Sequence, residues 1–234
     1  MDLKKEAARA ASLLVKNNTS IGLGDGSTIK YLAEFIINDL KNPGKKIYTS
    51  SASTKIFLQD AGIIVNDIST TDNLDIYFDG CDQVDYNLNA IKSGSGIHTQ
   101  EKLFATMANR FVILADTSKF VAVPDKKFPL VIEVLPQATI FVQKEIKNII
   151  PETIFNVRMQ AGENIFVKTQ NGNLLIDCFF NEWPDLEFIN NECKKITGLV
   201  EISLFYKIAT DAIIAGINGT QFYERKNDKV SLIN

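Results

Sequence analysis

Apolar and polar positions in the first half of the chain alternate between a helical and a strand-like spacing. Apolar residues from Leu3 to Val15 recur on one helical face, and this helix is expected to end at Asn17-Asn18. The short apolar run Ile21–Leu23 predicts a strand. A second apolar stripe, from Ile29 to Leu40, predicts another helix, which stops at Asn42-Pro43-Gly44.

The alternation continues to residue 115, with one long polar stretch inside it. Short apolar strands separated by helices favour a parallel sheet that helices cover. The stretch from Asp79 to Gly96 is expected to be a long polar loop. The other expected elements are strands at Ile47-Tyr48, Ile63–Val65, Ile76–Phe78 and Phe111–Ala115, and helices at Ser53–Asp60 and Thr99–Asn109.

Three polar turns follow strands of this expected sheet. They span Gly24–Thr28, Asp79–Gly96 and Asp116–Lys119. Ligands of parallel α/β sheets bind outside the carboxyl ends of the strands. The three turns are therefore predicted to converge on one site.

The pattern becomes irregular after Pro124, where strands and helices no longer alternate strictly. This mixture suggests a small α+β domain. The run Ala209–Ile217 is a further strand that is expected to return to the first domain, and the polar tail after Glu224 is expected to fray. The elements expected in the small domain are strands at Val131–Val134, Ile154–Met159, Ile165–Thr169 and Leu174–Phe180, with a turn at Asn171-Gly172, and helices at Gln137–Ile150 and Pro184–Lys195.

Composition limits the partners of the chain. Its 234 residues fit one large domain, or one domain with a small companion. The net charge of -3 gives no general attraction to nucleic acid or to an anionic membrane surface. No apolar run approaches the ~20 residues of a membrane span. A small anionic ligand would therefore need a local binding site.

The cysteines and the histidine do not suggest a metal centre. Cys81, Cys178 and Cys193 are odd in number and lack CxxC spacing, and His98 is the only histidine. Structural zinc needs about four clustered ligands. Three reduced thiols in a cytoplasmic protein, without a bound metal, are the prediction.

The turn Gly22–Thr28 has the features of a phosphate-binding loop. Glycines let the backbone turn and present N–H groups, the next helix begins there, and Ser27 and Thr28 add hydroxyl donors. A tight turn with a hydroxyl residue capping the helix is the alternative. The segment matches neither the Walker loop nor the GxGxxG dinucleotide pattern.

The acidic loop contains the residue types of a proton-transfer site. Asp79 and Asp82 follow a strand, Lys92 lies further along the loop, and Glu101 falls nine residues after Lys92. A carboxylate can take a proton from a carbon beside a carbonyl, and a cation can stabilise the resulting oxyanion. Turn-capping aspartates, a solvated surface lysine and an ordinary first-turn glutamate are the alternatives.

These motifs together resemble the type A ribose-5-phosphate isomerases. That family has a GxGTGST or GxGSGST loop, a DGADE segment, a lysine that opens a glycine-rich stretch, and a Glu-Lys pair nine residues later. The counterparts here are Gly22–Thr28, Asp79–Gln83, Lys92–Gly96 and Glu101-Lys102. Further similar stretches are Arg110–Lys119, Glu133–Pro136, Asn171–Asn173 with Asp177, and Ile196–Phe205.

The resemblance implies a role for each residue of the site. Glu101 would be the general base that moves a proton between C1 and C2 of ribose 5-phosphate through an enediolate. Asp79, Asp82 and Lys92 would hold sugar oxygens, help to open the furanose and stabilise the developing charge. The other implied substrate contacts are Lys4, Asp25, Gly26, Ser27, Thr28, Gly80, Cys81, Ser93, Gly94, Ser95 and Lys119.

The resemblance also implies the fold and the setting. A Rossmann-like, mostly parallel α/β domain would comprise residues 1–127 and 206–234, and a smaller ferredoxin-like α+β domain residues 128–205. The family uses neither a metal nor an organic cofactor. A homodimer or homotetramer in the cytoplasm, serving the non-oxidative pentose phosphate pathway, is expected.

The chain departs from the family pattern at several positions. Asp25 replaces a hydroxyl residue, and a carboxylate ~5 Å from a phosphate dianion costs roughly 1–3 kcal/mol, so Asp25 is expected to turn outward or to pair with a lysine such as Lys4. Gln83 replaces a glutamate. Ser93 and Ser95 replace glycines, which adds strain if the backbone there needs positive φ.

Three other residues carry expectations of their own. Cys81 replaces an alanine and fits as a small buried thiol. His98 is expected on a surface loop. Glu101 is expected to be ionised at pH 7, because the reference pKa of glutamate is ~4.3.

Two other classes of function remain as alternatives. One is a related enzyme, such as a sugar-phosphate deaminase or a CoA transferase that uses a glutamate nucleophile. The other is a sugar-phosphate binding module without catalysis, as in some transcription regulators. Ammonia release would reveal the deaminase, and stabilisation by ribose 5-phosphate without turnover would reveal the module.

Overall fold

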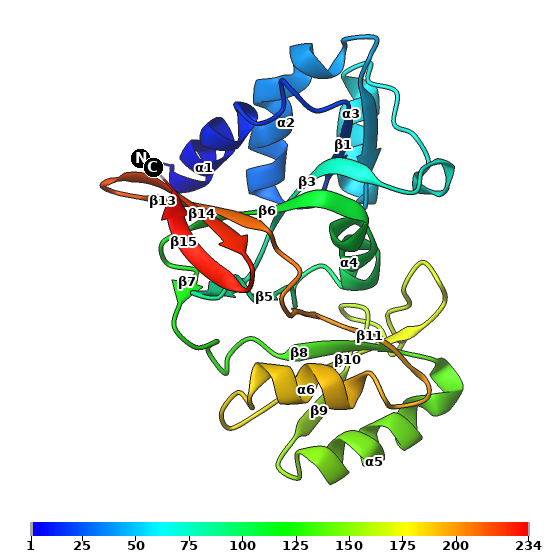
Figure 1. Cartoon of the computed structure of the whole chain (residues 1–234). Coiled ribbons are helices and arrows are strands. Elements are labelled where there is room, and N and C mark those ends of the chain that lie inside the picture. Colours follow the sequence, from blue (N-terminus) through cyan, green and yellow to red (C-terminus); the bar gives the residue numbers. More distant parts are fainter. Residues whose placement is uncertain (1, 234) are drawn as a thin grey trace.

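A seven-stranded sheet forms the centre of the larger part of the molecule (Figure 1). The computed structural model describes residues 2–233. In space the order of strands is β15-β14-β13-β6-β3-β1-β2, and the strands from β13 to β2 are mutually parallel. The strands are β1 (Ser20–Leu23), β2 (Lys46–Thr49), β3 (Leu74–Gly80), β6 (Ala108–Asp116), β13 (Asp211–Gly216), β14 (Gly219–Lys226) and β15 (Lys229–Ile233).

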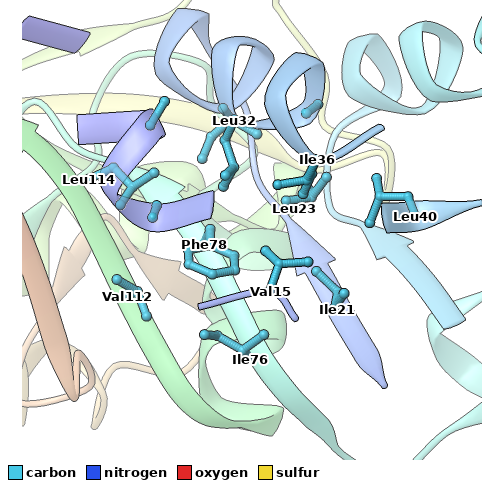
Figure 2. Close-up of a cluster of buried hydrophobic side chains, with 14 of the residues drawn as sticks. Val15, Ile21, Leu23, Leu32, Ile36, Leu40, Ile76, Phe78, Val112 and Leu114 are labelled. Atoms are coloured by element: carbon cyan, nitrogen blue, oxygen red, sulfur yellow. The ribbon is translucent and has the colours of Figure 1, made fainter. Parts of the chain in front are cut away.

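Helices pack on both faces of this sheet. One face carries α1 (Leu3–Ser12), α2 (Ser27–Leu40) and α3 (Ala52–Asp60), and the other carries α4 (His98–Met107). Figure 2 shows Leu32 and Ile36 of α2 above Leu23 and Phe78 of neighbouring strands. Each of these side chains is fully buried, which contributes roughly 1.5–3 kcal/mol apiece.

Strand β6 shows why both faces need helices. Val112 and Leu114 point into the core with α1 and α2, whereas Phe111 and Ile113 point into the core with α4. Side chains of a strand alternate between faces, so a strand with five successive apolar residues, as at positions 111–115, has to be covered on both faces. The packing of β6 on both faces and its parallel pairing confirm the prediction of a buried, parallel strand at 111–115.

The smaller part of the molecule is built on a second, antiparallel sheet with the order β11-β8-β10-β9. Side chains of two helices pack with it in a separate core. The elements are β8 (Leu130–Val134), β9 (Ile154–Val157), β10 (Leu174–Phe179), β11 (Leu199–Ile202), α5 (Thr139–Ile149) and α6 (Leu186–Cys193). An α/β fold with a small α+β part is thus confirmed. The boundaries at 127/128 and 205/206 stay predictions, and residues 1 and 234 lie outside the described part.

The stretch Asp79–Gly96 is not one long polar loop, as expected, because it contains two short strands. β4 (Gln83–Asp85) and β5 (Ala90–Ile91) join β7 (Phe120–Val121) and β12 (Leu204–Phe205) in a third sheet. Val84 and Leu88 are fully buried there. Isolated apolar residues among polar ones gave no periodic signal, so only the partner strands reveal this sheet. Two short 3-10 helices, Ile68–Thr70 and Pro136–Ala138, complete the description.

The first helix is shorter than expected. It begins after Asp2, whose carboxylate accepts hydrogen bonds from the first-turn amides, and it ends at Ser12. The next turns are held by Lys45, whose Nζ donates to the carbonyls of Val15 and Asn18. A lysine 30 residues away along the chain thus replaces the helical hydrogen bonds that the apolar spacing had suggested.

Three other expectations are wrong. Ile63–Val65 and Ile165–Thr169 are not strands and make only isolated bridges, at Val65, Phe166 and Lys168. The tail after Glu224 does not fray but completes the antiparallel hairpin β14–β15 at the edge of the large sheet. Pairing with a neighbour decides whether such short segments become strands.

Within residues 2–233, none of the helices is long and apolar enough to cross a bilayer.

Candidate active site

The three polar turns converge, as predicted, on a cavity of about 190 Å³ at the carboxyl ends of the parallel strands. Thirteen of the fifteen residues proposed for the site line it; Asp79 and Ser93 lie behind the lining. The lining residues are Lys4, Asp25, Gly26, Ser27, Thr28, Gly80, Cys81, Asp82, Lys92, Gly94, Ser95, Glu101 and Lys119.

One end of the cavity is the N-terminus of α2. Gly26 precedes the helix with a φ of 93°, a conformation that favours glycine, and Ser27 and Thr28 form its first turn. The Nζ of Lys4 lies 3.2 Å from the Ser27 hydroxyl. Free amides, the helix dipole and an ammonium group together make this end suited to an anion such as a phosphate.

Asp79 lies buried behind the cavity and holds neighbouring residues of the site by hydrogen bonds. Its Oδ2 accepts hydrogen bonds from the Tyr77 hydroxyl at 2.7 Å and from Lys92 Nζ at 2.9 Å. Its Oδ1 accepts from the amides of Gly80 at 2.7 Å and Asp25 at 3.2 Å. The side chain is fully buried and has four donors, so it orients its neighbours and does not open onto the cavity.

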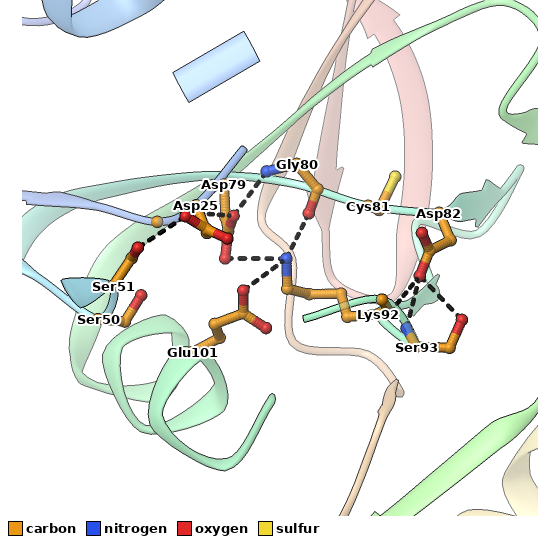
Figure 3. Close-up of polar contacts among 12 residues, drawn as sticks. Asp25, Ser50, Ser51, Asp79, Gly80, Cys81, Asp82, Lys92, Ser93 and Glu101 are labelled. Carbon is orange, nitrogen blue, oxygen red and sulfur yellow. Dashed lines mark hydrogen bonds and ion pairs between the residues drawn. The ribbon is translucent and has the colours of Figure 1, made fainter. Parts of the chain in front are cut away.

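Lys92 is buried and not the solvated surface lysine of the alternative reading. Figure 3 shows its Nζ between three oxygens: Asp79 Oδ2, the Gly80 carbonyl at 2.6 Å and Glu101 Oε1 at 3.3 Å. Burial acts to lower the pKa of Lys92, but the carboxylates of Asp79 and Glu101 outweigh it and raise the pKa above its usual value. A permanent positive charge therefore lines the cavity.

Glu101 lies in the first turn of α4 and is almost fully buried. Its Oε1 contacts Lys92, whereas its Oε2 accepts no hydrogen bond from any described residue. Burial raises the pKa of Glu101 to about 8, with Lys92 opposing the shift and Asp79 adding to it. The expectation of an ordinary glutamate pKa is therefore wrong. A carboxylate with a raised pKa and a free oxygen has the properties of a general base.

Asp82 lies on the opposite side of Lys92 (Figure 3). Its Oδ2 accepts from the Ser93 amide at 2.5 Å, the Ser93 hydroxyl at 2.9 Å and the Gly94 amide at 3.1 Å. None of the residues 2–233 donates a hydrogen bond to its Oδ1. The loop fixes one oxygen and leaves the other for a ligand.

Ser93 and Ser95 do not have positive φ, so the backbone strain expected for serines in place of glycines is not present.

Asp25 turns toward α3 and not, as one expectation had it, toward Lys4. Its Oδ1 accepts hydrogen bonds from the hydroxyls of Ser51 at 2.6 Å and Ser53 at 2.7 Å. Partial burial pushes the pKa of Asp25 upward, but the hydrogen bonds from Ser51, Ser53 and the Gly26 amide, together with the charge of Lys92, lower it below its usual value. The negative charge therefore persists at the wall of the cavity.

Cys81 and Lys119 also line the cavity. Cys81 is a small buried thiol, as predicted, and burial raises its pKa to about 12, so the thiol is not a nucleophile at neutral pH. Lys119 Nζ donates to the Cys81 carbonyl at 2.5 Å. The Gln83 side chain accepts from the Asp125 amide at 2.6 Å and has a structural role.

His98 is not on a surface loop, as expected, but is fully buried at the start of α4. Its Nε2 lies 3.3 Å from the Glu201 carbonyl, and its Nδ1 has no partner among the described residues. Burial, assisted by Lys102, lowers the pKa of His98 to about 4. The imidazole is therefore neutral, and it packs behind the cavity without lining it.

Sequence reasoning missed the residues that hold the charged groups. Tyr77 lies two positions before Asp79 on β3, and the i, i+2 spacing places both on one face. Ser51 and Ser53 follow β2, whose carboxyl end lies at the same edge of the sheet. The i, i+2 spacing of Tyr77 and Asp79 was visible in the sequence, whereas the pairing of Ser51 and Ser53 with Asp25 depends on the tertiary structure. Within residues 2–233, no group of three or more His, Cys, Asp or Glu side chains could hold a metal ion.

A mostly parallel sheet with a buried acid–base pair at its carboxyl edge, beside a helix N-terminus, defines an α/β enzyme that acts on a small anion. Residues 46–219 match the family model for ribose 5-phosphate isomerase A (phosphoriboisomerase A). The chain belongs to this family.

Individual members of the family are similar to this chain over nearly its whole length. Ribose-5-phosphate isomerase A 1 of Oceanobacillus iheyensis is 36% identical over 91% of this chain and 93% of its own. The ribose 5-phosphate isomerase A structure from Methanocaldococcus jannaschii has a TM-score of 0.86 at 31% identity, covering 96% and 99% of the two chains. A D-ribose-5-phosphate isomerase in complex with phospho-erythronic acid also has a TM-score of 0.86 at 31% identity, with 96% and 98% covered.

Proposed function

We propose that this protein interconverts D-ribose 5-phosphate and D-ribulose 5-phosphate. The observation that carries the proposal is the unpartnered Oε2 of Glu101, buried beside the Lys92 ammonium in the wall of the cavity. The complex of a relative with phospho-erythronic acid supports a short phosphorylated ligand. The cavity of about 190 Å³ is smaller than the ~300–1,000 Å³ of drug-sized sites, which also favours a small ligand.

The ligand is held by its phosphate at the α2 end. The amides around Gly26, the hydroxyls of Ser27 and Thr28 and the Lys4 ammonium supply donors and positive charge. Anchoring the phosphate there directs the carbon chain along the cavity toward Glu101. Asp82 Oδ1 is free to accept a hydroxyl of the sugar, and it assists opening of the furanose ring.

Proton transfer then proceeds on the open-chain aldose. Glu101 removes the proton from C2, the electrons of the C–H bond form a C1–C2 double bond, and O1 gains the negative charge of an enediolate. Glu101 returns the proton to C1 while the hydroxyl proton of O2 passes to O1, which leaves a carbonyl at C2. Lys92 stabilises the charge on oxygen during this sequence, and Asp79 holds Lys92 in place.

Direct measurement of ribulose 5-phosphate formation, with a chelator present, tests the proposal. The purified chain should convert ribose 5-phosphate, and Glu101→Gln should lower kcat by ~10²–10⁴ while its circular dichroism stays unchanged. Glu34→Gln, at an exposed position of α2, is the matched control and should keep normal turnover. Near-normal turnover of Glu101→Gln would refute the role of this base.

The same preparation separates the alternatives. Ammonia release from an amino sugar phosphate would indicate a deaminase. Thermal stabilisation by ribose 5-phosphate without turnover would indicate a binding module.

We further propose that the protein serves the non-oxidative pentose phosphate pathway in the cytoplasm as a homodimer or homotetramer. Cys81, Cys178 and Cys193 are buried free thiols, which fits a reducing compartment. The side chains of Ile140 and Phe141 on α5 are exposed, which fits a surface that a second copy covers. Light scattering of the purified chain tests the assembly, and a monomer at micromolar concentration would contradict it.

A further inference from the structure

We propose that Arg158, in the smaller part of the molecule, is a positioning residue that holds the Asp82 carboxylate and the loop 93–96 in their working geometry. The inference rests on the proposed isomerase function. Arg158 directly follows β9, and neither it nor its partner Asp177 lines the cavity. Neither residue was singled out as a site residue on the sequence alone.

The guanidinium of Arg158 reaches from the small sheet to the loop at the cavity. Its Nη1 donates to the Gly94 carbonyl at 3.1 Å, and its Nη2 donates to the Ser93 carbonyl. Its Nε donates to Asp177 Oδ1 at 2.8 Å. The fixed fork of donors thus joins one carboxylate and two successive loop carbonyls, a pattern that a lysine cannot reproduce in full.

The peptide group between Ser93 and Gly94 links Arg158 to Asp82. Its carbonyl accepts from Arg158, and its N–H donates to Asp82 Oδ2 at 3.1 Å. The peptide dipole therefore lies between a cation and an anion in the direction that both favour, and hydrogen bonds in such a chain reinforce one another. Loss of Arg158 removes the group that aligns this peptide and thereby the Asp82 oxygen.

The loop 93–96 also packs closely against Arg158 and β10. A Cβ added at Gly96, whose φ is +73°, would lie 2.5 Å from a methyl group of Leu175 and 3.2 Å from Arg158 Nη1. The backbone amide of Arg158 itself donates to the Leu175 carbonyl at 2.9 Å. The loop is therefore pressed against β10, and the arginine holds it from the side of the small sheet.

Asp177 keeps the guanidinium oriented. It lies on β10, and the side chains of Arg158 and Asp177 are only 18% and 14% exposed. A charge-assisted pair at 2.8 Å with so little water restricts the arginine to one geometry. The small sheet thus supplies a rigid support for a loop of the active site.

Steady-state kinetics and hydrogen exchange of four variants test the inference. Arg158→Ala should raise KM for ribose 5-phosphate about tenfold, Arg158→Lys should recover part of that loss, and Asp177→Asn should raise KM about threefold. Amide exchange of the peptide covering residues 93–96 should become about tenfold faster in Arg158→Ala. Arg110→Ala is the matched control, because Arg110 forms a comparable pair with Asp211 (2.7 Å) away from the cavity.

The outcomes separate this inference from the proposed function. A wild-type chain without turnover overturns the isomerase assignment, and the exchange measurement still tests the loop. An active wild type whose Arg158→Ala variant keeps KM within twofold and exchange unchanged overturns the role of Arg158. A similar rise of KM in Arg110→Ala would also overturn it, because a general loss of stability would then account for the effect.

Discussion

The Asp79 carboxyl group occupies the space in which a side chain at residue 24 would lie. A Cβ added to Gly24 would fall 2.1 Å from Asp79 Cγ. The phosphate loop and the acidic loop are therefore in contact at this point, and the glycine is needed for that close approach and not for an unusual φ. Through Asp79 the contact also sets the position of Lys92, 2.9 Å away.

Gly24→Ala should consequently damage the site more than the fold. The added methyl group forces Asp79 and its ion pair with Lys92 to move, so kcat should fall at least tenfold, and overpacking should cost ~1–3 kcal/mol of stability. Gly44→Ala, where nothing lies within 4 Å of the new Cβ, should leave both quantities unchanged. Initial rates and urea unfolding measure them, and a Gly24→Ala variant with the kcat of wild type would contradict the described contact.

The pH profile should report the raised pKa of Glu101. The general base works only when deprotonated, and burial raises its pKa to about 8. The logarithm of kcat/KM should therefore increase with pH below about 8 and level off above it. A profile that is flat from pH 6 to 9 would show that Glu101 titrates outside this range or is not the base.

Asp25→Asn should improve the affinity for the substrate. The carboxylate at the cavity wall repels a phosphate dianion by roughly 1–3 kcal/mol, so its removal should lower KM at least about fivefold. The charge of Asp25 also contributes to the raised pKa of Glu101. The midpoint of the pH profile should therefore shift to lower pH in the variant. An unchanged KM together with an unchanged midpoint would exclude both effects.

The buried His98 should make the fold sensitive to acid. Its pKa is lowered to about 4 in the folded chain and is ~6.5 when unfolded, so the unfolded state binds a proton more readily. The stability due to neutral His98 is fully present above the unfolded pKa of ~6.5 and is lost progressively as the pH falls from there to about 4. His98→Gln cannot titrate, so urea midpoints should converge with those of wild type between pH 7 and 4.5. A constant difference would contradict the neutral, buried imidazole.

Much of the site was predictable because its residues lie in short segments with fixed local chemistry. Glycines before a helix, aspartates directly after a strand and a glutamate in a first helical turn are local features. The carboxyl ends of parallel strands share one edge of the sheet, so these features had to meet. This reasoning placed the loop that carries Asp82 and Lys92 at the cavity, and the resemblance to the isomerase family implied that Glu101 lies beside them.

Other properties depended on partners distant in sequence. Ser51 and Ser53, at the start of α3, hold Asp25 from 26 and 28 residues further along the chain. Arg158 reaches the loop at Ser93 from 65 residues away. No local pattern identifies such pairs, because hydrogen bonding between side chains depends on where the whole chain folds.

The sequence by itself determined the alternating architecture, the order of the motifs and the residue types that gather at the cavity. Only the tertiary structure decided that His98 is buried and neutral, that the pKa of Glu101 is raised, that Asp25 turns to α3 and that the tail forms β14 and β15. The physical reason is that periodicity and turn chemistry act over a few residues. Burial, and therefore desolvation and pKa, is set by all segments that pack around a group.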